Sequence, residues 1–226
     1  MSKIKVIVNG ARGKMGIETV KAVSKENDLE LVAELDMGDD LVKAIKDKQA
    51  QVVVDFTHPT TAFSNIKNIL ESGAHAVVGT TGITAEDLKK IEDICAKTKK
   101  NCLVAPNFAI GAVLMMQFSK EAAAYMQDVE IIEFHHPQKA DKPSGTAIKT
   151  AKMIKEVIGE DKEVPIHAVR LPGLVAHQEV IFGGLSQTLT IRHDTINRES
   201  FMPGVILGIR KIGSQNGLVY GLEKIL

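Results

Sequence analysis

The chain has 226 residues, 44% of them hydrophobic and 25% charged, which is typical of a globular protein with one or two cores. Its 28 basic and 28 acidic residues balance, so bulk charge gives no reason to expect nucleic acid or an anionic membrane as a partner. Two cysteines, Cys95 and Cys102, form no thiolate metal pattern or disulfide framework, and no apolar run approaches the roughly 18 residues of a membrane span. We therefore expect a cytoplasmic protein.

Short apolar runs alternate with amphipathic stretches in the first half of the chain. This pattern predicts strands over residues 4–8, 29–35, 52–56, 76–78 and 102–105, and helices over residues 14–24, 39–46, 60–71 and 85–97. Such alternation favours parallel strands joined by right-handed crossovers, with both faces of the sheet covered. The first half therefore predicts an α/β fold with a Rossmann-type doubly wound sheet.

The second half has a different pattern. We expect helices over residues 110–126 and 146–158, and strands over residues 129–134, 166–170, 179–182 and 187–192. Strands that follow one another without intervening helices indicate a smaller α+β domain with an open mixed sheet. We expect the tail to return to the first domain, so that residues 1–107 and 199–226 form one domain and residues 108–198 the other.

Gly10, Gly13 and Gly16 follow the first predicted strand and open the first predicted helix. Gly10 permits a tight turn, Gly13 allows the backbone to approach a pyrophosphate at the helix start, and Gly16 allows close contact between helix and strand. Asp36 ends the second predicted strand, where an acid meets the ribose hydroxyls of a dinucleotide. The alternative is a glycine turn without a ligand.

The sequence leaves the choice of nicotinamide cofactor open. Asp36 favours NADH because its charge repels a 2′-phosphate, whereas Arg12 and Lys14 offer positive charge that would neutralise one. Two further turns, Gly79-Thr80-Thr81-Gly82 and Ala105-Pro106-Asn107-Phe108, follow predicted strands. Each is either a ligand-binding loop or an ordinary connection.

The segment from Glu133 to Ala147 is the richest in reactive side chains. His135 can exchange a proton near neutral pH, and Lys139 supplies a positive charge and a proton donor. Ser144 precedes a helix whose first backbone N–H groups suit a carboxylate. A solvated loop before a normally capped helix is the alternative. No metal is expected, because Glu133 lies only two residues before His135 in a strand and nothing nearby completes a site.

Five strings occur in order along the chain: Gly10 to Gly16, Asp55-Phe56-Thr57-His58-Pro59, Gly79 to Gly82, Ala105 to Phe108, and His135 to Ala147. Together they resemble the 4-hydroxy-tetrahydrodipicolinate reductase (dihydrodipicolinate reductase) family, over residues 4–204. The resemblance implies NAD(P)H-dependent reduction of 4-hydroxy-tetrahydrodipicolinate, through dihydrodipicolinate, to tetrahydrodipicolinate in the diaminopimelate pathway to lysine. It also implies a dinucleotide-binding first domain, a second domain for substrate binding and oligomerisation, and a homotetramer.

The resemblance also assigns residues. It implies that His135 is the proton donor and Lys139 the second catalytic residue. The implied substrate contacts are His136, Ser144, Gly145 and Thr146. The implied cofactor contacts are Gly10, Ala11, Arg12, Gly13, Lys14, Met15, Asp36, Phe56, Gly79, Thr80, Thr81, Ala105, Pro106, Asn107, Phe108 and Arg198.

Two alternatives belong to other functional classes. Another amino-acid-pathway dehydrogenase, such as a semialdehyde dehydrogenase, needs an activated cysteine, but Cys95 falls in a predicted amphipathic helix and Cys102 starts a predicted buried strand. A non-catalytic NAD(H)-sensing protein would keep the glycine loop and Asp36 but has no need of His135 with Lys139.

Overall fold

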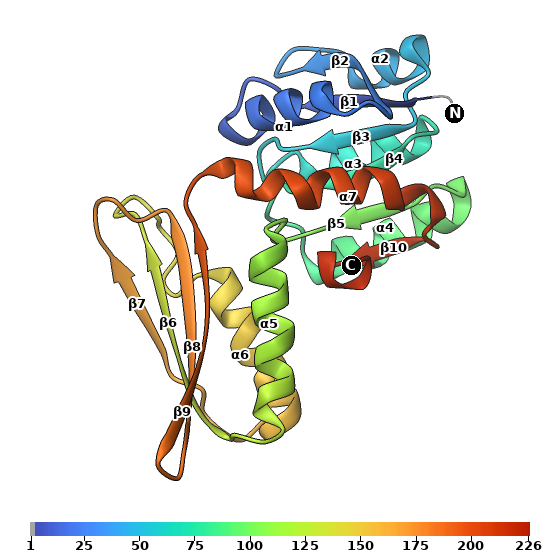
Figure 1. Ribbon diagram of the computed structural model, residues 1–226. Coiled ribbons are helices and arrows are strands. Elements are labelled where there is room, and N and C mark those ends of the chain that lie inside the picture. Colours follow the sequence, from blue (N-terminus) through green and yellow to red (C-terminus); the bar gives the residue numbers. More distant parts are fainter. Residues whose placement is uncertain (1–2) are drawn as a thin grey trace. The chain divides into compact units, whose positions relative to one another are not determined.

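The computed structural model describes residues 3–226, and the chain divides into two compact units. Residues 1 and 2, which the sequence assigns to the first domain, lie outside the described residues. The first unit comprises the chain up to Phe108 together with Phe201–Leu226, and the second comprises Ala109–Ser200. Figure 1 shows a sheet flanked by helices in the first unit and another sheet with helices on one face in the second.

A six-stranded sheet in the order β10-β5-β4-β3-β1-β2 forms the first unit, and all its strand pairs are parallel. The strands are β1 (Ile4–Asn9), β2 (Leu29–Leu35), β3 (Val52–Asp55), β4 (His75–Val78), β5 (Cys102–Val104) and β10 (Leu218–Tyr220). The helices are α1 (Lys14–Lys25), α2 (Leu41–Lys48), α3 (Ala62–Glu71), α4 (Ala85–Thr98) and α7 (Met202–Lys211). The predicted Rossmann-type sheet is confirmed.

The composition of the strands explains this sheet. β3 is Val-Val-Val-Asp and is buried along its whole length, as a parallel strand covered on both faces should be. Ile7 and Val53 join a core cluster on one face with Ile66 of α3 and Ile91 of α4. The second predicted helix starts at Leu41 rather than at residue 39, because the side chain of Asp40 accepts a hydrogen bond from Lys43 N and so caps the helix.

The tail returns to the first unit. After the short helix η1 (Arg198–Phe201) come α7, η2 (Ile212–Ser214), the edge strand β10 and η3 (Leu222–Lys224). β10 extends the sheet beyond β5, with Leu218 opposite Cys102 and Tyr220 opposite Val104. Within residues 3–226, no helix combines the length and the apolar character needed to cross a bilayer.

The second unit has a four-stranded mixed sheet in the order β7-β6-β8-β9. Its strands are β6 (Asp128–His135), β7 (Ile166–Arg170), β8 (Ala176–Gly184) and β9 (Gln187–Thr195), and its helices are α5 (Ile110–Ala123) and α6 (Gly145–Ile158). β6 and β7 are parallel, whereas β8 is antiparallel to both β6 and β9. Both helices pack on one face of the sheet (Figure 1). The predicted mixed sheet is confirmed.

Candidate active site

The glycine loop after β1 is tightly packed. Gly10 has a φ of +83°, which favours glycine, and a Cβ on it would overlap the backbone oxygen of Phe56. A Cβ on Gly16 would overlap the backbone oxygen of Gly10, so helix α1 can cross the loop this closely only without a side chain there. The loop therefore requires the glycines that the sequence places in it.

The start of α1 has the features of an anion site. Gly13 is the N-cap, no side chain of the described residues caps this helix, and its first turn contains no acidic residue. By contrast, Thr84 and Asp87 form a reciprocal capping box at the start of α4. The first N–H groups of α1 are thus left for an external acceptor, and the positive end of the helix dipole favours an anion there. These features fit the pyrophosphate of a nicotinamide dinucleotide.

Asp36 follows β2 and is bonded to this loop. Its Oδ2 accepts a 2.8 Å hydrogen bond from the backbone N–H of Arg12, and its Oδ1 accepts one of 2.8 Å from Met37 N. These two backbone donors, Met37 first, lower the pKa of Asp36 below its ordinary value. Met37 itself is 97% exposed.

A buried carboxylate organises the same edge of the sheet. Asp55, at the end of β3, is fully buried and accepts hydrogen bonds from Asn9 Nδ2 at 2.8 Å, Thr57 Oγ1 at 2.9 Å and Thr80 Oγ1 at 2.5 Å. It joins the ends of β1 and β3 to the loop after β4, which includes Thr80. The sequence reading assigned no role to Asn9 or Asp55.

Aromatic packing completes this edge of the first unit. The rings of Phe56 and Phe108 meet edge to face, with centroids 5.9 Å apart, and a Cβ on Gly79 would overlap the Phe56 ring. Ala105 N donates to the backbone oxygen of Val78, which aligns the turn after β5 with the end of β4. Predicted cofactor residues from the ends of five parallel strands, β1 to β5, thus lie along one edge of the sheet. Thr81 and Pro106 are exposed; Arg198, the remaining predicted cofactor contact, belongs to the second unit and is also exposed.

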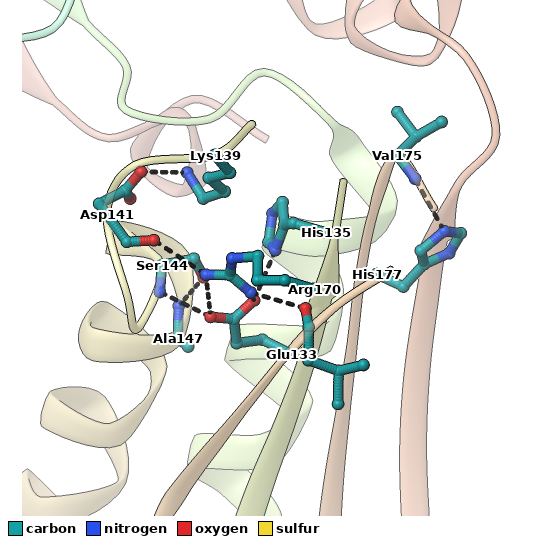
Figure 2. Close-up of polar contacts among 10 residues, drawn as sticks. Glu133, His135, Lys139, Asp141, Ser144, Ala147, Arg170, Val175 and His177 are labelled. Carbon is teal, nitrogen blue, oxygen red and sulfur yellow. Dashed lines mark hydrogen bonds and ion pairs between the residues drawn. The ribbon is translucent and has the colours of Figure 1, made fainter. Parts of the chain in front are cut away.

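The second unit builds its polar cluster from two paired strands. β6 and β7 run parallel with His135 opposite Arg170, and strand alternation places Glu133 on the same face as His135. Glu133 is fully buried. Figure 2 shows its carboxylate at the centre of a network that includes His135, Ser144 and Arg170.

Glu133 accepts hydrogen bonds at both of its oxygens. Oε1 accepts from Arg170 Nη2 at 2.7 Å and from Ser144 N at 3.0 Å. Oε2 accepts from Arg170 Nη1 at 2.8 Å and lies 2.5 Å from His135 Nδ1. Arg170 is therefore a bidentate partner, the geometry that makes guanidinium–carboxylate pairs strong. From the sequence, Glu133 was considered only as a possible metal ligand, and Arg170 was not predicted as a site residue.

At both Glu133 and His135, burial shifts the pKa in one direction and the charge of the other residue shifts it in the opposite direction. Burial raises the pKa of Glu133, but the hydrogen bonds from Arg170 and His135 outweigh it, so the pKa lies below its ordinary value. Burial lowers the pKa of His135, and the opposing effect of Glu133 does not restore it. At neutral pH the pair is therefore a carboxylate beside a mostly neutral imidazole.

The loop after β6 carries Lys139, which is bonded within the loop itself. Its Nζ donates a 2.7 Å hydrogen bond to Asp141 Oδ1, and the Lys139 side chain is 22% exposed. Burial raises the pKa of Asp141, but Lys139 and the backbone of Gly145 outweigh it and lower the pKa overall. Asp141 thus places a carboxylate between Lys139, the predicted second catalytic residue, and the start of α6, which is predicted to bind the substrate.

Two features of the segment between β6 and α6 suit a small dicarboxylate. Ser144 caps the helix through a 3.2 Å hydrogen bond from Ala147 N to its Oγ, so Gly145 and Thr146 form the first turn. Nδ1 of His136 is buried and has no hydrogen-bond partner among the described residues. An unpaired buried nitrogen is costly, and a bound carboxylate or water would satisfy it.

The cysteines do not resemble activated nucleophiles. Burial raises the pKa of Cys95 to about 11, and Cys102 is fully buried, which also raises the pKa of its thiol. A reactive cysteine needs a lowered pKa and access to its substrate. A mechanism of the semialdehyde dehydrogenase type therefore has no nucleophile at either position.

Family models, curated proteins and a solved structure all match this chain to the same kind of reductase. The family model described as Dihydrodipicolinate reductase, N-terminus matches residues 4–108, and the one described as Dihydrodipicolinate reductase, C-terminus matches residues 111–226. Curated 4-hydroxy-tetrahydrodipicolinate reductases from Coxiella burnetii (strain Dugway 5J108-111) and Mycolicibacterium smegmatis are 48% and 49% identical, over 99% of each chain. A solved structure, dipicolinate-bound dihydrodipicolinate reductase from Paenisporosarcina sp. TG-14, is 41% identical with a TM-score of 0.90, covering 99% of this chain and 100% of that chain.

Proposed function

Because the chain belongs to the dihydrodipicolinate reductase family, we propose that it reduces 4-hydroxy-tetrahydrodipicolinate, through dihydrodipicolinate, to tetrahydrodipicolinate. The reaction uses NADH or NADPH and belongs to diaminopimelate and lysine biosynthesis. Dihydrodipicolinate, which forms when 4-hydroxy-tetrahydrodipicolinate loses water, is a flat, conjugated imine with two carboxylates. Its reduction needs a hydride donor, a proton donor and two anion-binding groups.

The observation that carries the proposal is the cluster at the start of α6. His135, Lys139 and Ser144 are joined there through Glu133, Arg170 and Asp141. One substrate carboxylate would replace that of Asp141 at Lys139 and at the start of α6. His136, with its buried unpaired Nδ1, would contact the substrate beside them.

His135 would deliver the proton. Its pKa is lowered in the protein without substrate, so it must first gain a proton. The two negative charges of the substrate favour that protonation, because an opposite charge nearby stabilises the imidazolium. His135 would then be charged mainly when there is a substrate to reduce.

In the first unit, the cofactor would bind at the sheet edge that carries the glycine loop. NADH or NADPH supplies the hydride. The first turn of α1 would take the pyrophosphate, and Asp36 would accept hydrogen bonds from the adenosine ribose. The backbone around Phe56, Thr80 and Asn107, with the other predicted contacts, would line the rest of the dinucleotide.

The second unit would also join copies of the chain, and we propose a homotetramer in the cytoplasm. α5 and α6 cover only one face of the sheet (Figure 1). The opposite face carries Ile132, Phe134 and Ile181, all only partly buried, and Arg192 lies 5.5 Å from the centre of the Phe134 ring. Glu179 and Arg192 lie on the same face by strand register. Partly buried apolar side chains among charged ones are typical of an interface between subunits. Light scattering at increasing protein concentration measures the assembly, and a persistent monomer would contradict it.

The function is tested with His135→Gln. We expect the rate constant kcat to fall about 100-fold or more, the usual contribution of a positioned proton donor, while the Kd for NADH stays within about twofold. An unchanged kcat would remove His135 from the mechanism. Tight NADH binding by the unsubstituted protein, without substrate-dependent oxidation, would instead favour a nucleotide-sensing protein.

A further inference from the structure

Glu133 contacts both the predicted proton donor, His135, and the residue that caps α6, Ser144. The conformation in Figure 2 uses each of its oxygens twice: Oε1 for Arg170 and Ser144, and Oε2 for Arg170 and His135. A carboxylate offers about four acceptor positions, so this one has none left for a ligand. Glu133 therefore supports the reacting groups and does not bind the ligand itself.

We propose that Glu133, held by Arg170, is a positioning residue that keeps His135 in the Nδ1-protonated tautomer and anchors the start of α6. The role in catalysis rests on the proposed reductase function, whereas the tautomer is a property of the protein alone. Glu133 would contact neither substrate nor cofactor. It would act through His135 and through the backbone N–H of Ser144.

The tautomer follows from the contacts of the carboxylate. An ionised carboxylate only accepts hydrogen bonds, so His135 Nδ1, 2.5 Å from Oε2, must carry the proton. In the neutral ring Nε2 then has the lone pair, and it is the atom that takes up and passes on a proton. The wrong tautomer would place the only N–H of the neutral ring at Nε2 and leave Nδ1 facing the carboxylate with a lone pair.

Arg170 keeps the carboxylate in the form that this role requires. Its two parallel hydrogen bonds compensate the buried charge of Glu133, and the pKa of Glu133 lies below its ordinary value although burial opposes this. Nη2 of Arg170 also donates to the backbone oxygen of Asp141 at 2.8 Å. The loop that carries Lys139 is thereby fixed to the same ion pair as His135.

Glu133→Gln separates this role from simple packing, because the shape is kept and one acceptor becomes a donor. If the amide oxygen stays with Arg170 Nη2 and Ser144 N, the NH₂ group faces one donor, Arg170 Nη1, and the ring of His135. If the amide is flipped, the NH₂ group faces two donors, Arg170 Nη2 and Ser144 N. The first orientation has fewer conflicts, and in it His135 Nδ1 must accept. Glu133→Gln should therefore favour the Nε2-protonated tautomer.

Nitrogen NMR of ¹⁵N-histidine-labelled protein measures this directly. The His135 signals are identified by their loss in His135→Gln. We expect Nδ1 to be protonated in the neutral ring of the unsubstituted protein and Nε2 to be protonated in Glu133→Gln. An Nε2-protonated ring in the unsubstituted protein, or the same tautomer in both proteins, would overturn the proposal whether or not the chain is a reductase.

A pH titration followed by the same NMR signals shows in which direction each substitution shifts the pKa of His135. The charged groups that face the His135 ring are Glu133 on its own strand, Arg170 on β7 and Lys139 in the following loop. Removing the carboxylate in Glu133→Gln should lower the pKa of His135 further. Removing the guanidinium in Arg170→Gln should raise it. A general loss of packing would not move the two variants in opposite directions, and shifts of the same sign would contradict the proposal.

Kinetics then connect the tautomer with the reaction. We expect Glu133→Gln to lower kcat about 100-fold while the Kd for NADH is unchanged. Because the proton donor must be protonated to act, we expect the alkaline limb of its kcat/KM profile to move to lower pH. Glu156→Gln is the matched control. It removes an exposed carboxylate of α6, which forms a 2.6 Å ion pair with Lys120 of α5. The control should keep both the rate and the profile. Normal kcat in Glu133→Gln with an altered tautomer would show that the tautomer does not serve catalysis.

Discussion

The backbone N–H of Arg12 donates a 2.8 Å hydrogen bond to Oδ2 of Asp36, which ties the glycine loop after β1 to the residue that follows β2. The same two segments are joined by hydrogen bonds from Gly10 N and Ala11 N to the backbone oxygen of Leu35. Asp36 is thus held in place before any ligand binds. In the proposed function its carboxylate faces the adenosine ribose.

Asp36→Ala should change the preference between cofactors. Loss of the charged acceptor removes about 1.5–3 kcal/mol of binding free energy for NADH, so we expect its Kd to rise roughly 10- to 100-fold. NADPH should lose less, because the substitution also removes repulsion of the 2′-phosphate. Fluorescence titration with both cofactors measures this. Asp47→Ala, at an exposed position of α2, is the control, and an equal loss for both cofactors would contradict the role of Asp36.

Gly16→Ala should damage the cofactor site. The added methyl group would overlap the backbone oxygen of Gly10, and overpacking of this kind costs about 1–3 kcal/mol in the free energy of unfolding. The loop must shift to relieve it, so NADH binding should weaken as well. Urea denaturation and NADH titration test both effects. Gly213→Ala is the matched control, since a Cβ there meets no atom within 4 Å; equal behaviour of the two variants would contradict the packing argument.

The sequence was informative wherever the signal was local. Strand and helix positions followed from the apolar patterns, and the spacing of the glycines correctly predicted a tight turn between β1 and α1. Two of the expected strand ranges, 29–35 and 166–170, agree with β2 and β7 at both ends. β10 was not predicted because three residues, Leu218 to Tyr220, are too few to show a pattern.

The polar cluster of the second unit could be predicted only in part. His135, Lys139 and Ser144 lie close together in the sequence, and their grouping is visible there. Arg170 reaches Glu133 only because β7 pairs with β6, and 37 residues separate the two along the chain. No local pattern distinguishes Arg170 from a surface arginine. Glu133 had a usable signal, since it alternates with His135 on a strand and therefore shares its face.

Lys139→Ala should impair use of the substrate. The substitution removes a charge-assisted hydrogen bond to a substrate carboxylate, worth about 1.5–3 kcal/mol, so kcat/KM should fall roughly 10- to 100-fold. The Kd for NADH should stay the same. Steady-state kinetics measure the loss, with Lys152→Ala, an exposed lysine of α6, as the control. Kinetics equal to those of the control would exclude Lys139 from the site.

Stability should rise with pH around neutrality. Burial lowers the pKa of His75, His135 and His193 below the ordinary value of 6.5. Below that pH the unfolded chain binds more protons than the folded protein, so the free energy of unfolding falls as pH drops through 6.5 toward the folded pKa values. Urea denaturation between about pH 5.5 and 7.5 checks this. His75→Gln should flatten the dependence, and a free energy of unfolding that increases on acidification would contradict it.

The proposed reductase activity is tested by measuring cofactor oxidation in the presence of freshly made substrate. The protein is mixed with NADH or NADPH while the lysine-pathway synthase condenses pyruvate with aspartate semialdehyde, and the near-ultraviolet absorbance of the reduced cofactor is followed. We predict oxidation that requires both synthase substrates and that falls about 100-fold in His135→Gln. No oxidation with either cofactor, despite measurable NADH binding, would contradict it.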